Sequence, residues 1–216
     1  MSSTFRPPRQ QRSAATLDRI VKAAEELFAE GGFEATTVDD IVARAGSSKG
    51  SFYARFTDKQ ALLAYLGGEC LSRAKATWAE LLDPERTASR PLDTVIEELV
   101  RNLVADYRGS DGPLMRALTI EARQQPGGEF QEMTDDLDRH IRDSLEGLLR
   151  ARSAEISHPS PKRAARVGLL MLDASTREAV LFATDRGGPL GVSDAELRRE
   201  LTRGYLGYLG HLADQK

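Results

Sequence analysis

The sequence has few of the residues on which disulfide-bonded, metal-binding and membrane proteins depend. Cys70 is the only cysteine among 216 residues, so neither an internal disulfide framework nor a zinc site of several cysteines is expected. The three histidines, His140, His158 and His211, are far apart and form no ligand pair, so we predict no metal and no cofactor. No run approaches the roughly 20 apolar residues of a membrane span, and residues 1–12 lack the apolar segment of a secretory signal. We therefore expect a soluble, cytoplasmic protein.

The overall charge does not by itself indicate a nucleic-acid partner. The chain carries 30 Lys and Arg against 33 Asp and Glu, a net charge of -3. The distribution is more informative than the total, because residues 1–13 contain Arg6, Arg9 and Arg12 and no acid. We interpret this segment as a flexible basic arm, which is either a disordered tail or a segment that reaches a minor groove.

Helical periodicity dominates the sequence, and no segment shows the alternation of a strand. The clearest run has apolar residues three and one positions apart from Leu92 to Tyr107, which is typical of a helix that faces a core. Capping boxes mark two helix starts, at Thr57–Gln60 and at Ser193–Glu196. We predict an all-α fold of about nine helices, near residues 17–28, 38–45, 49–56, 58–81, 92–107, 114–123, 130–148, 161–184 and 194–213.

Residues 38–56 have the pattern of a helix-turn-helix, in which two short helices flank a turn that contains glycine. Gly46 suits the turn because a left-handed backbone is cheap only for glycine. The second helix alternates outward polar residues with inward aromatic ones: Lys49, Ser51, Tyr53 and Arg55 against Phe52 and Phe56. Lysine and tyrosine can donate to phosphates, and Arg55 can bind a guanine edge bidentately.

Some twenty positions between residues 19 and 63 form a longer pattern that contains this motif: Arg19-Ile20, Ala23-Ala24, Leu27-Phe28, Gly31-Gly32-Phe33, Thr36-Thr37-Val38, Asp40-Ile41, Ala45-Gly46, Ser48 to Tyr53, Phe56 and Lys59 to Leu63. With these residues the segment resembles the N-terminal signature of the TetR family of bacterial transcription regulators. The resemblance implies a three-helix DNA-binding domain, and then a fourth helix that leads into a helical domain for ligand binding and dimerisation. We therefore divide the chain into residues 1–13, the arm, 14–60, the DNA-binding domain, and 61–216, the effector and dimerisation domain.

The resemblance also implies which residues contact DNA. Tyr53 stands at the family's phosphate-binding aromatic position, and Lys59 stands at its phosphate-binding lysine. Arg44 is as well placed to stabilise the end of its own helix. Two departures from the family pattern are Ser47, where an apolar residue is usual, and the pair Ala54-Arg55, so the base preference cannot be transferred from relatives. The predicted DNA-binding residues are Thr37, Arg44, Ser48, Lys49, Ser51, Tyr53, Arg55 and Lys59.

The last two predicted helices have the composition of a dimer interface. Residues 167–172 are six consecutive non-polar residues, and a helix of that kind must be buried on more than one face. A partner subunit is one cover for the second face, and an internal core position is the alternative. The resemblance implies a four-helix interface and a homodimer that reads two half-sites about 34–36 Å apart on a pseudo-palindromic operator. The predicted interface residues are Leu169, Leu172, Leu201, Tyr205, Tyr208 and Leu212.

Between these regions lies the segment where a small-molecule effector is expected to bind. Large apolar and methionine side chains can surround a hydrophobic ligand, although each of them also suits a plain core. The predicted pocket residues are Trp78, Tyr107, Met115, Leu118, Phe130, Met133 and Met171. The expected function is that of a repressor released from its operator by this ligand.

Other functional classes have weaker support in the sequence. An enzyme would need a cluster of nucleophile, base or metal ligands, whereas acids such as Asp135-Asp136 are adjacent and point about 100° apart on a helix. A helical module that uses the helix-turn-helix for protein contacts is a second alternative. A DNA-binding regulator with a protein effector, or one that activates, is a third.

Overall fold

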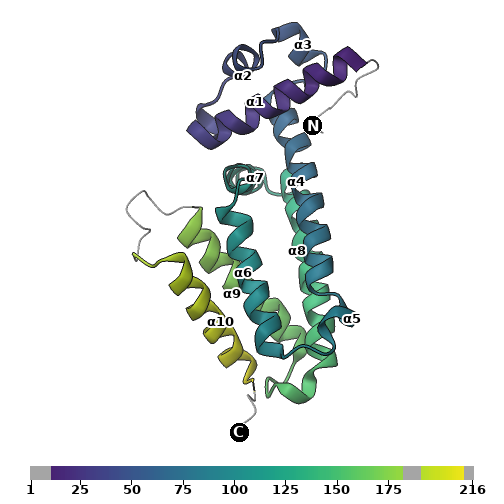
Figure 1. Ribbon diagram of the computed structural model, residues 1–216, viewed down its shortest axis with the longest axis vertical. Coiled ribbons are helices and arrows are strands. Elements are labelled where there is room, and N and C mark those ends of the chain that lie inside the picture. Colours follow the sequence, from purple (N-terminus) through teal and green to yellow (C-terminus); the bar gives the residue numbers. More distant parts are fainter. Residues whose placement is uncertain (1–10, 182–190, 212–216) are drawn as a thin grey trace. The chain divides into compact units, whose positions relative to one another are not determined.

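The computed structural model describes residues 11–181 and 191–211 (Figure 1). Helices account for nearly all regular structure in these ranges, and an isolated β-bridge joins Ile156 and His211. The predicted all-α fold is confirmed. The helices are α1 (Gln11–Ala35), α2 (Val38–Arg44), α3 (Lys49–Tyr53), α4 (Lys59–Leu81), α5 (Pro84–Thr87), α6 (Leu92–Arg108), α7 (Gly112–Gln124), α8 (Glu129–Ala151), a 3-10 turn (Ser153–Glu155), α9 (Pro161–Val180) and α10 (Asp194–Leu209).

The chain forms two compact units, and α4 and α8 contribute residues to both. The first unit extends to Ser72 and also includes Ser110–Asp135, whereas the second contains Arg73–Gly109 and the residues from Asp136 onward. The predicted boundary at residue 60 therefore falls inside the first unit. The α7 helix packs along α1, which brings the distant segment Ser110–Asp135 into the first unit.

The core of the first unit is built from the apolar faces of α1, α2, α3 and α4. Their fully or almost fully buried side chains include Ile20, Ala24, Phe28, Ile41, Phe52, Leu62 and Leu63, and Phe56 between α3 and α4 is buried with them. The α7 helix packs closely against α4 at Gly67. A Cβ atom on this glycine would lie 2.6 Å from a methyl carbon of Leu118. The phenylalanines predicted to point inward are thus confirmed as core residues.

Helix caps set the start of the short helices in this unit. The Thr37 hydroxyl accepts from the backbone N–H of Asp40, and the Asp40 carboxylate accepts from the backbone N–H of Thr37, which is a capping box. The predicted cap at Thr57 is wrong: α4 begins at Lys59, and the Asp58 carboxylate accepts from the backbone N–H of Ala61 at 2.7 Å. Asp58 is one residue closer to the helix and provides the stronger acceptor.

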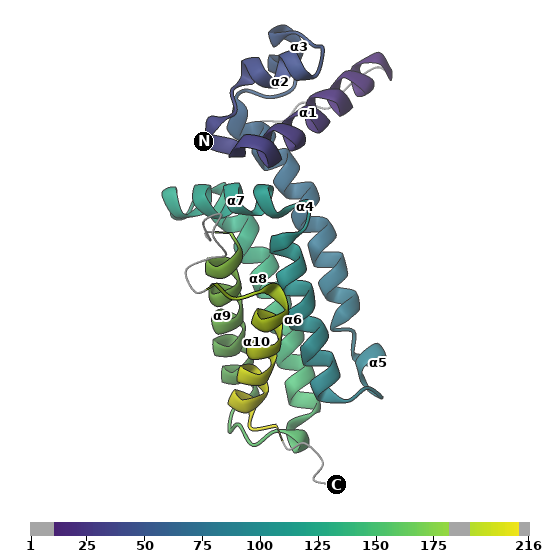
Figure 2. The same ribbon diagram turned by 60° about the vertical axis from the view of Figure 1, so that its left-hand side comes forward.

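The second unit has α6, α9 and α10 side by side, as both views show (Figures 1 and 2). Every member of the predicted apolar stripe of α6 is buried, from Leu92 to Tyr107. The α9 and α10 helices approach closely at Gly168, where a Cβ atom would lie 2.0 Å from the ring of Tyr205. The Ser193–Glu196 capping box is present at the start of α10.

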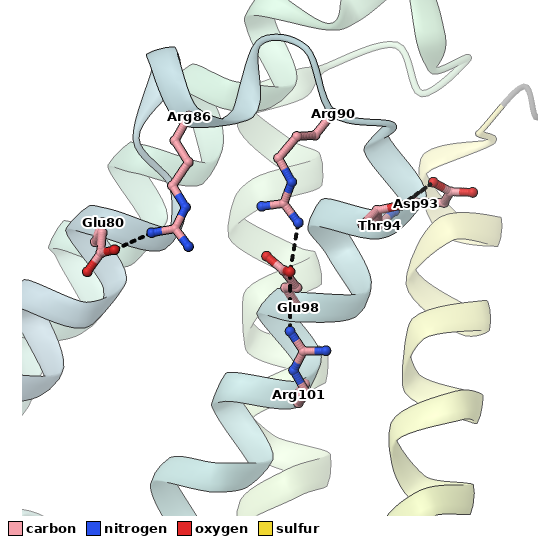
Figure 3. A network of polar contacts seen from close by, with 7 residues as sticks. All are labelled: Glu80, Arg86, Arg90, Asp93, Thr94, Glu98 and Arg101. Carbon is pink, nitrogen blue, oxygen red and sulfur yellow. Dashed lines mark hydrogen bonds and ion pairs between the residues drawn. The ribbon is translucent and has the colours of Figure 1, made fainter.

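One helix of the described residues, α5, was not predicted. It has only four residues, too few for a periodic pattern, and begins with the Asp83 side chain accepting from the backbone N–H of Arg86. Salt bridges surround it (Figure 3): Arg86 pairs with Glu80 on α4, and Glu98 on α6 pairs with Arg90 at 2.7 Å and with Arg101. All of these contacts lie within the second unit and join the connection between α4 and α6 to the two helices.

Candidate nucleic-acid interface

The α2 and α3 helices form the predicted helix-turn-helix. They contact each other across residues 45–48, and Gly46 has a positive φ of 55° in this turn. The backbone N–H of Ser47 donates to the carbonyl of Val42 at 2.9 Å, which closes the turn. The glycine predicted from the motif is therefore required by its backbone conformation.

The α3 helix separates its buried and exposed faces sharply. Phe52 is fully buried, whereas the neighbouring Tyr53 is 50% exposed; the two rings meet edge to face with centroids 5.4 Å apart. Among the described residues, the Tyr53 hydroxyl has no hydrogen-bond partner, so it is available to a ligand outside the chain. Tyr53 therefore points outward and packs against a core aromatic ring, and its contact with a DNA phosphate stays a prediction.

The two serines predicted to contact DNA are occupied in capping α3. The Ser48 hydroxyl accepts from the backbone N–H of Ser51 at 3.2 Å, and the two hydroxyl oxygens lie 3.0 Å apart. Both retain lone pairs or a proton for a further partner. Thr37 caps α2 in the same way that Ser48 caps α3. Arg55, the remaining predicted contact next to α3, is half-buried.

Lys49, at the exposed start of α3, is paired with an acid that sequence reasoning missed. Its ammonium nitrogen lies 2.7 Å from a carboxylate oxygen of Asp39 on the first turn of α2. The hydrogen bond to Asp39 raises the pKa of Lys49. The sequence shows an acid at the start of α2, which suggests an ion pair there, but it does not show which basic side chain is the partner.

Arg44 is used inside the unit. Its guanidinium donates to both oxygens of Glu30 at 2.9 and 2.8 Å, and it lies 3.6 Å from Glu26. The hydrogen bond to Glu30 raises the pKa of Arg44, and the same contact lowers that of Glu30. Arg44 therefore ties α2 to α1, and its guanidinium is not a free donor on the recognition surface.

Lys59 is held internally as well, at the carboxyl end of α1. Its half-buried ammonium group donates to the carbonyls of Phe33 at 2.7 Å, Thr36 at 2.9 Å and Glu34 at 3.4 Å. It also lies 4.2 Å from the centroid of the Phe33 ring. These carbonyls point together because the helix breaks at Gly32, which has a φ of 81°. All three ammonium protons thus have partners within the unit, and Lys59 links α4 to the end of α1. Its contact with a DNA phosphate stays a prediction.

The balance of charge in residues 14–60 is unusual for a surface that meets DNA. This segment holds eight carboxylates and six basic side chains, and Arg44, Lys49 and Lys59 are among the bases with partners within the unit. The attraction of this domain for a polyanion therefore depends on a few well-placed groups and not on a general positive charge.

The predicted effector residues do not form one set within either unit. Met115, Leu118, Phe130 and Met133 belong to the first unit, whereas Trp78, Tyr107 and Met171 belong to the second. Most of them are buried, but Met171 is 47% exposed on α9.

Two of the predicted pocket residues make polar contacts in the core of the second unit. The indole N–H of Trp78 donates to Asp106 at 2.9 Å, and the hydroxyl of Tyr107 donates to Asp173. Asp173 also accepts from Arg177 at 2.9 Å. These contacts anchor the two aromatic rings, which fits the alternative interpretation as core residues.

The residues predicted for a dimer interface divide between core and surface. Leu169, Leu172 and Tyr205 are buried in the second unit, and the Tyr205 hydroxyl donates to the carbonyl of Ala164. These three side chains therefore belong to the core and not to an outer face. Leu201 and Tyr208 are half-buried, and Leu212 lies outside the described residues.

The outward face of α9 carries apolar side chains that the prediction had not singled out for the interface. Val167, Leu170 and Met171 are 37%, 63% and 47% exposed. Two of them, Val167 and Leu170, also line a surface hollow of about 480 Å³ together with Ser160, Lys162, Arg163 and Arg166. The α9 helix was predicted to be buried on more than one face. In the single chain, one of its apolar faces is exposed.

The described part of the chain lacks two features of other protein classes. None of its helices is long and apolar enough to cross a membrane. The same residues contain no group of three or more His, Cys, Asp or Glu side chains suited to a metal ion.

Comparisons with known proteins agree on one family. Residues 20–66 match the family model of bacterial regulatory proteins of the tetR family, and residues 91–209 match that of the tetracyclin repressor-like C-terminal domain. The HTH-type transcriptional regulator YerO of Bacillus subtilis is 30% identical over 135 residues, which cover 59% of this chain and 45% of that protein. The fatty acid metabolism regulator protein of Bacillus subtilis is 27% identical over 150 residues, 68% of this chain and 74% of that protein.

The chain thus spans about half the length of YerO, the first of these relatives. A solved structure from Mesorhizobium loti, described as a TetR-family transcriptional regulator, has a TM-score of 0.68 at 22% identity and covers 93% of this chain and 100% of its own. At that identity the structural match supports the shared fold.

Proposed function

The chain belongs to the TetR family of bacterial transcription regulators, and on that premise we propose that it represses transcription from an operator that it leaves when a small molecule binds. The observation that carries the proposal is the helix-turn-helix with α3 buried at Phe52 and exposed at Tyr53. A single aromatic with a free hydroxyl on a small exposed helix fits a phosphate contact beside a major groove. The protein then acts in the cytoplasm and has no membrane partner and no enzymatic role.

The DNA contacts follow from which side chains remain available. Tyr53, Lys49 and Ser51 share the outward side of α3 and are the groups we assign to DNA, with Arg55 and the caps Ser48 and Thr37 beside them. Arg44 and Lys59 are assigned to positioning, because their donors are used on α1.

The protein is proposed to work as a homodimer through α9 and α10. A stripe of Val167, Leu170 and Met171 recurs at helical spacing on an exposed face, and a second copy would remove it from water. Leu170→Glu should therefore give a monomer by sedimentation velocity, whereas Val192→Glu, at another exposed apolar residue, should leave the dimer intact. A wild-type chain that sediments as a monomer at micromolar concentration would contradict this part of the proposal.

Release by an effector is proposed to act through α4. This helix contributes residues 59–72 to the first unit and residues 73–81 to the second, so it is a continuous element of both. A ligand that favours another position of α4 would move Lys59, and with it the end of α1 to which Lys59 is bonded. A coupling of about 1–3 kcal/mol would weaken operator binding about 5- to 150-fold.

The test begins with selection of bound sequences from genomic fragments and from a random duplex library. We expect one enriched motif with two half-sites one helical turn apart and a steep negative dependence of affinity on salt. A panel of hydrophobic small molecules should then include one that weakens binding to that motif. Enrichment of no sequence would contradict DNA recognition and favour a protein-interaction module, whereas a panel without effect would contradict only the effector.

A further inference from the structure

A carboxylate stands beside the exposed face of the recognition helix, where a DNA-binding surface usually carries bases. Asp39 is on the first turn of α2, and its side chain is 65% exposed. It lies 2.7 Å from the ammonium group of Lys49, which is one helical turn before Tyr53 on α3. An acid at this position opposes the negative charge of any duplex that approaches α3.

The fold does not require Asp39. The capping box of α2 is made by Thr37 and Asp40, so the neighbouring acid performs the capping role. The ion pair with Lys49 is exposed on both sides, and pairs of this kind contribute little to stability. The carboxylate therefore has its main effect on what approaches the surface.

On DNA without the operator sequence, only phosphates are available to this surface, and both possible arrangements of Lys49 are unfavourable. If Lys49 stays with Asp39, it neutralises no phosphate and releases no counterion. If it moves to a phosphate, the carboxylate loses its partner and stands near the negatively charged backbone. Either way, binding to such DNA is weakened.

On the basis of the proposed function, we propose that Asp39 is a specificity-determining residue that acts against DNA without the operator sequence. On the operator, the carboxylate accepts a hydrogen bond from an amino group on a base edge while Lys49 turns to a phosphate. In the major groove, cytosine N4 and adenine N6 supply such donors, and acidic side chains pair with cytosine N4 in particular. Each half-site is thus expected to hold a cytosine or adenine at the position that Asp39 reaches.

The experiment compares the wild-type chain with Asp39→Asn, which keeps the size of the side chain and removes its charge. Affinity is measured over a range of salt for the selected operator and for a shuffled duplex of the same composition. On the shuffled duplex, Asp39→Asn should bind at least about threefold tighter at low salt, and the slope of log affinity against log salt should steepen by about 0.9, one phosphate contact. The operator should gain less than the shuffled duplex, so the specificity ratio falls, and selection with the variant should shift the base preference at that position of each half-site toward adenine, with which an asparagine amide pairs bidentately.

Two control variants make the test specific. Glu25→Gln removes one exposed carboxylate from α1, far along the sequence from the ion pair, and should leave the specificity ratio unchanged. In a Lys49→Met background, Asp39→Asn should no longer steepen the salt dependence, because the ammonium group that it frees is absent.

The outcomes separate this proposal from the proposed function. If the wild type selects an operator but Asp39→Asn strengthens both duplexes equally, or if Glu25→Gln has the same effect, the role of Asp39 is refuted and DNA recognition stands. If the wild type binds no DNA at any salt concentration, both are refuted.

Discussion

Replacing Lys59 by methionine is expected to destabilise the folded chain, because the structure makes this lysine a strut. Methionine keeps the unbranched stem and a similar helix propensity but removes the donors. The ammonium group makes two close hydrogen bonds to carbonyls, at 2.7 and 2.9 Å, and a longer one at 3.4 Å. Hydrogen bonds to charged groups contribute about 1.5–3 kcal/mol each, and water can reach part of this half-buried site. We therefore expect a total loss of about 2–3 kcal/mol.

A loss of this size can be measured by thermal unfolding. For a chain of this length, 1 kcal/mol changes the Tm by roughly 2–4 °C, so Lys59→Met should lower it by about 4–12 °C at fixed protein concentration. Lys22→Met is the matched control, since Lys22 is an exposed lysine on α1 and such substitutions change stability by no more than about 0.5 kcal/mol. If both variants melt within about 2 °C of the wild type, the carbonyl contacts contribute nothing and Lys59 is free for DNA.

Three further predictions rest on single contacts. Gly168→Ala should cost about 1–3 kcal/mol of unfolding free energy because the new Cβ meets a ring on α10 at 2.0 Å, as overpacked cores do, whereas Gly204→Ala, with open space around it, should be neutral or stabilising in the same urea titration. Hydrogen bonds from Thr37 lower the pKa of Asp40, so their stabilisation is present above the unfolded pKa and is lost as pH falls through the folded one; Thr37→Ala should flatten the acid limb of stability against pH. Tyr53→Phe should leave the Tm unchanged and weaken operator binding, and an unchanged affinity would exclude the phosphate contact.

The parts of the fold that the sequence predicted are those that depend on neighbours a few residues away. The capping box at Ser193–Glu196, the turn at Gly46 and the buried stripe of α6 are decided within one or two helical turns, so local chemistry identifies them. The cap at Thr57 was predicted wrongly because Asp58 competes for the same role at the next position. Local patterns thus fix which face of a helix is buried and only approximately where the helix begins.

Partners across the tertiary structure could not be predicted in this way. Arg44 pairs with a carboxylate 14 residues earlier, and Lys59 donates to carbonyls 23 to 26 residues earlier. The phosphate contact of Lys59 was predicted from the family resemblance, and Arg44 was predicted either to contact DNA or to stabilise the end of its own helix. Which internal acceptors they meet depends on how the end of α1 turns at Gly32, and no periodicity encodes that turn.

These internal partners change how the recognition domain must work. A surface in which carboxylates outnumber bases within residues 14–60 gains little from counterion release on arbitrary DNA, so its affinity has to come from correctly placed contacts. Arg44 and Lys59 hold α1, α2 and α4 in fixed relation, which preorganises α3 and lowers the entropic cost of docking it. Arg44 and Lys59 thus use their charge to position the recognition helix, and Lys49, Ser51 and Tyr53 are the groups on its outward side that we assign to DNA. We therefore expect this domain to bind arbitrary DNA weakly and to discriminate well between DNA sequences.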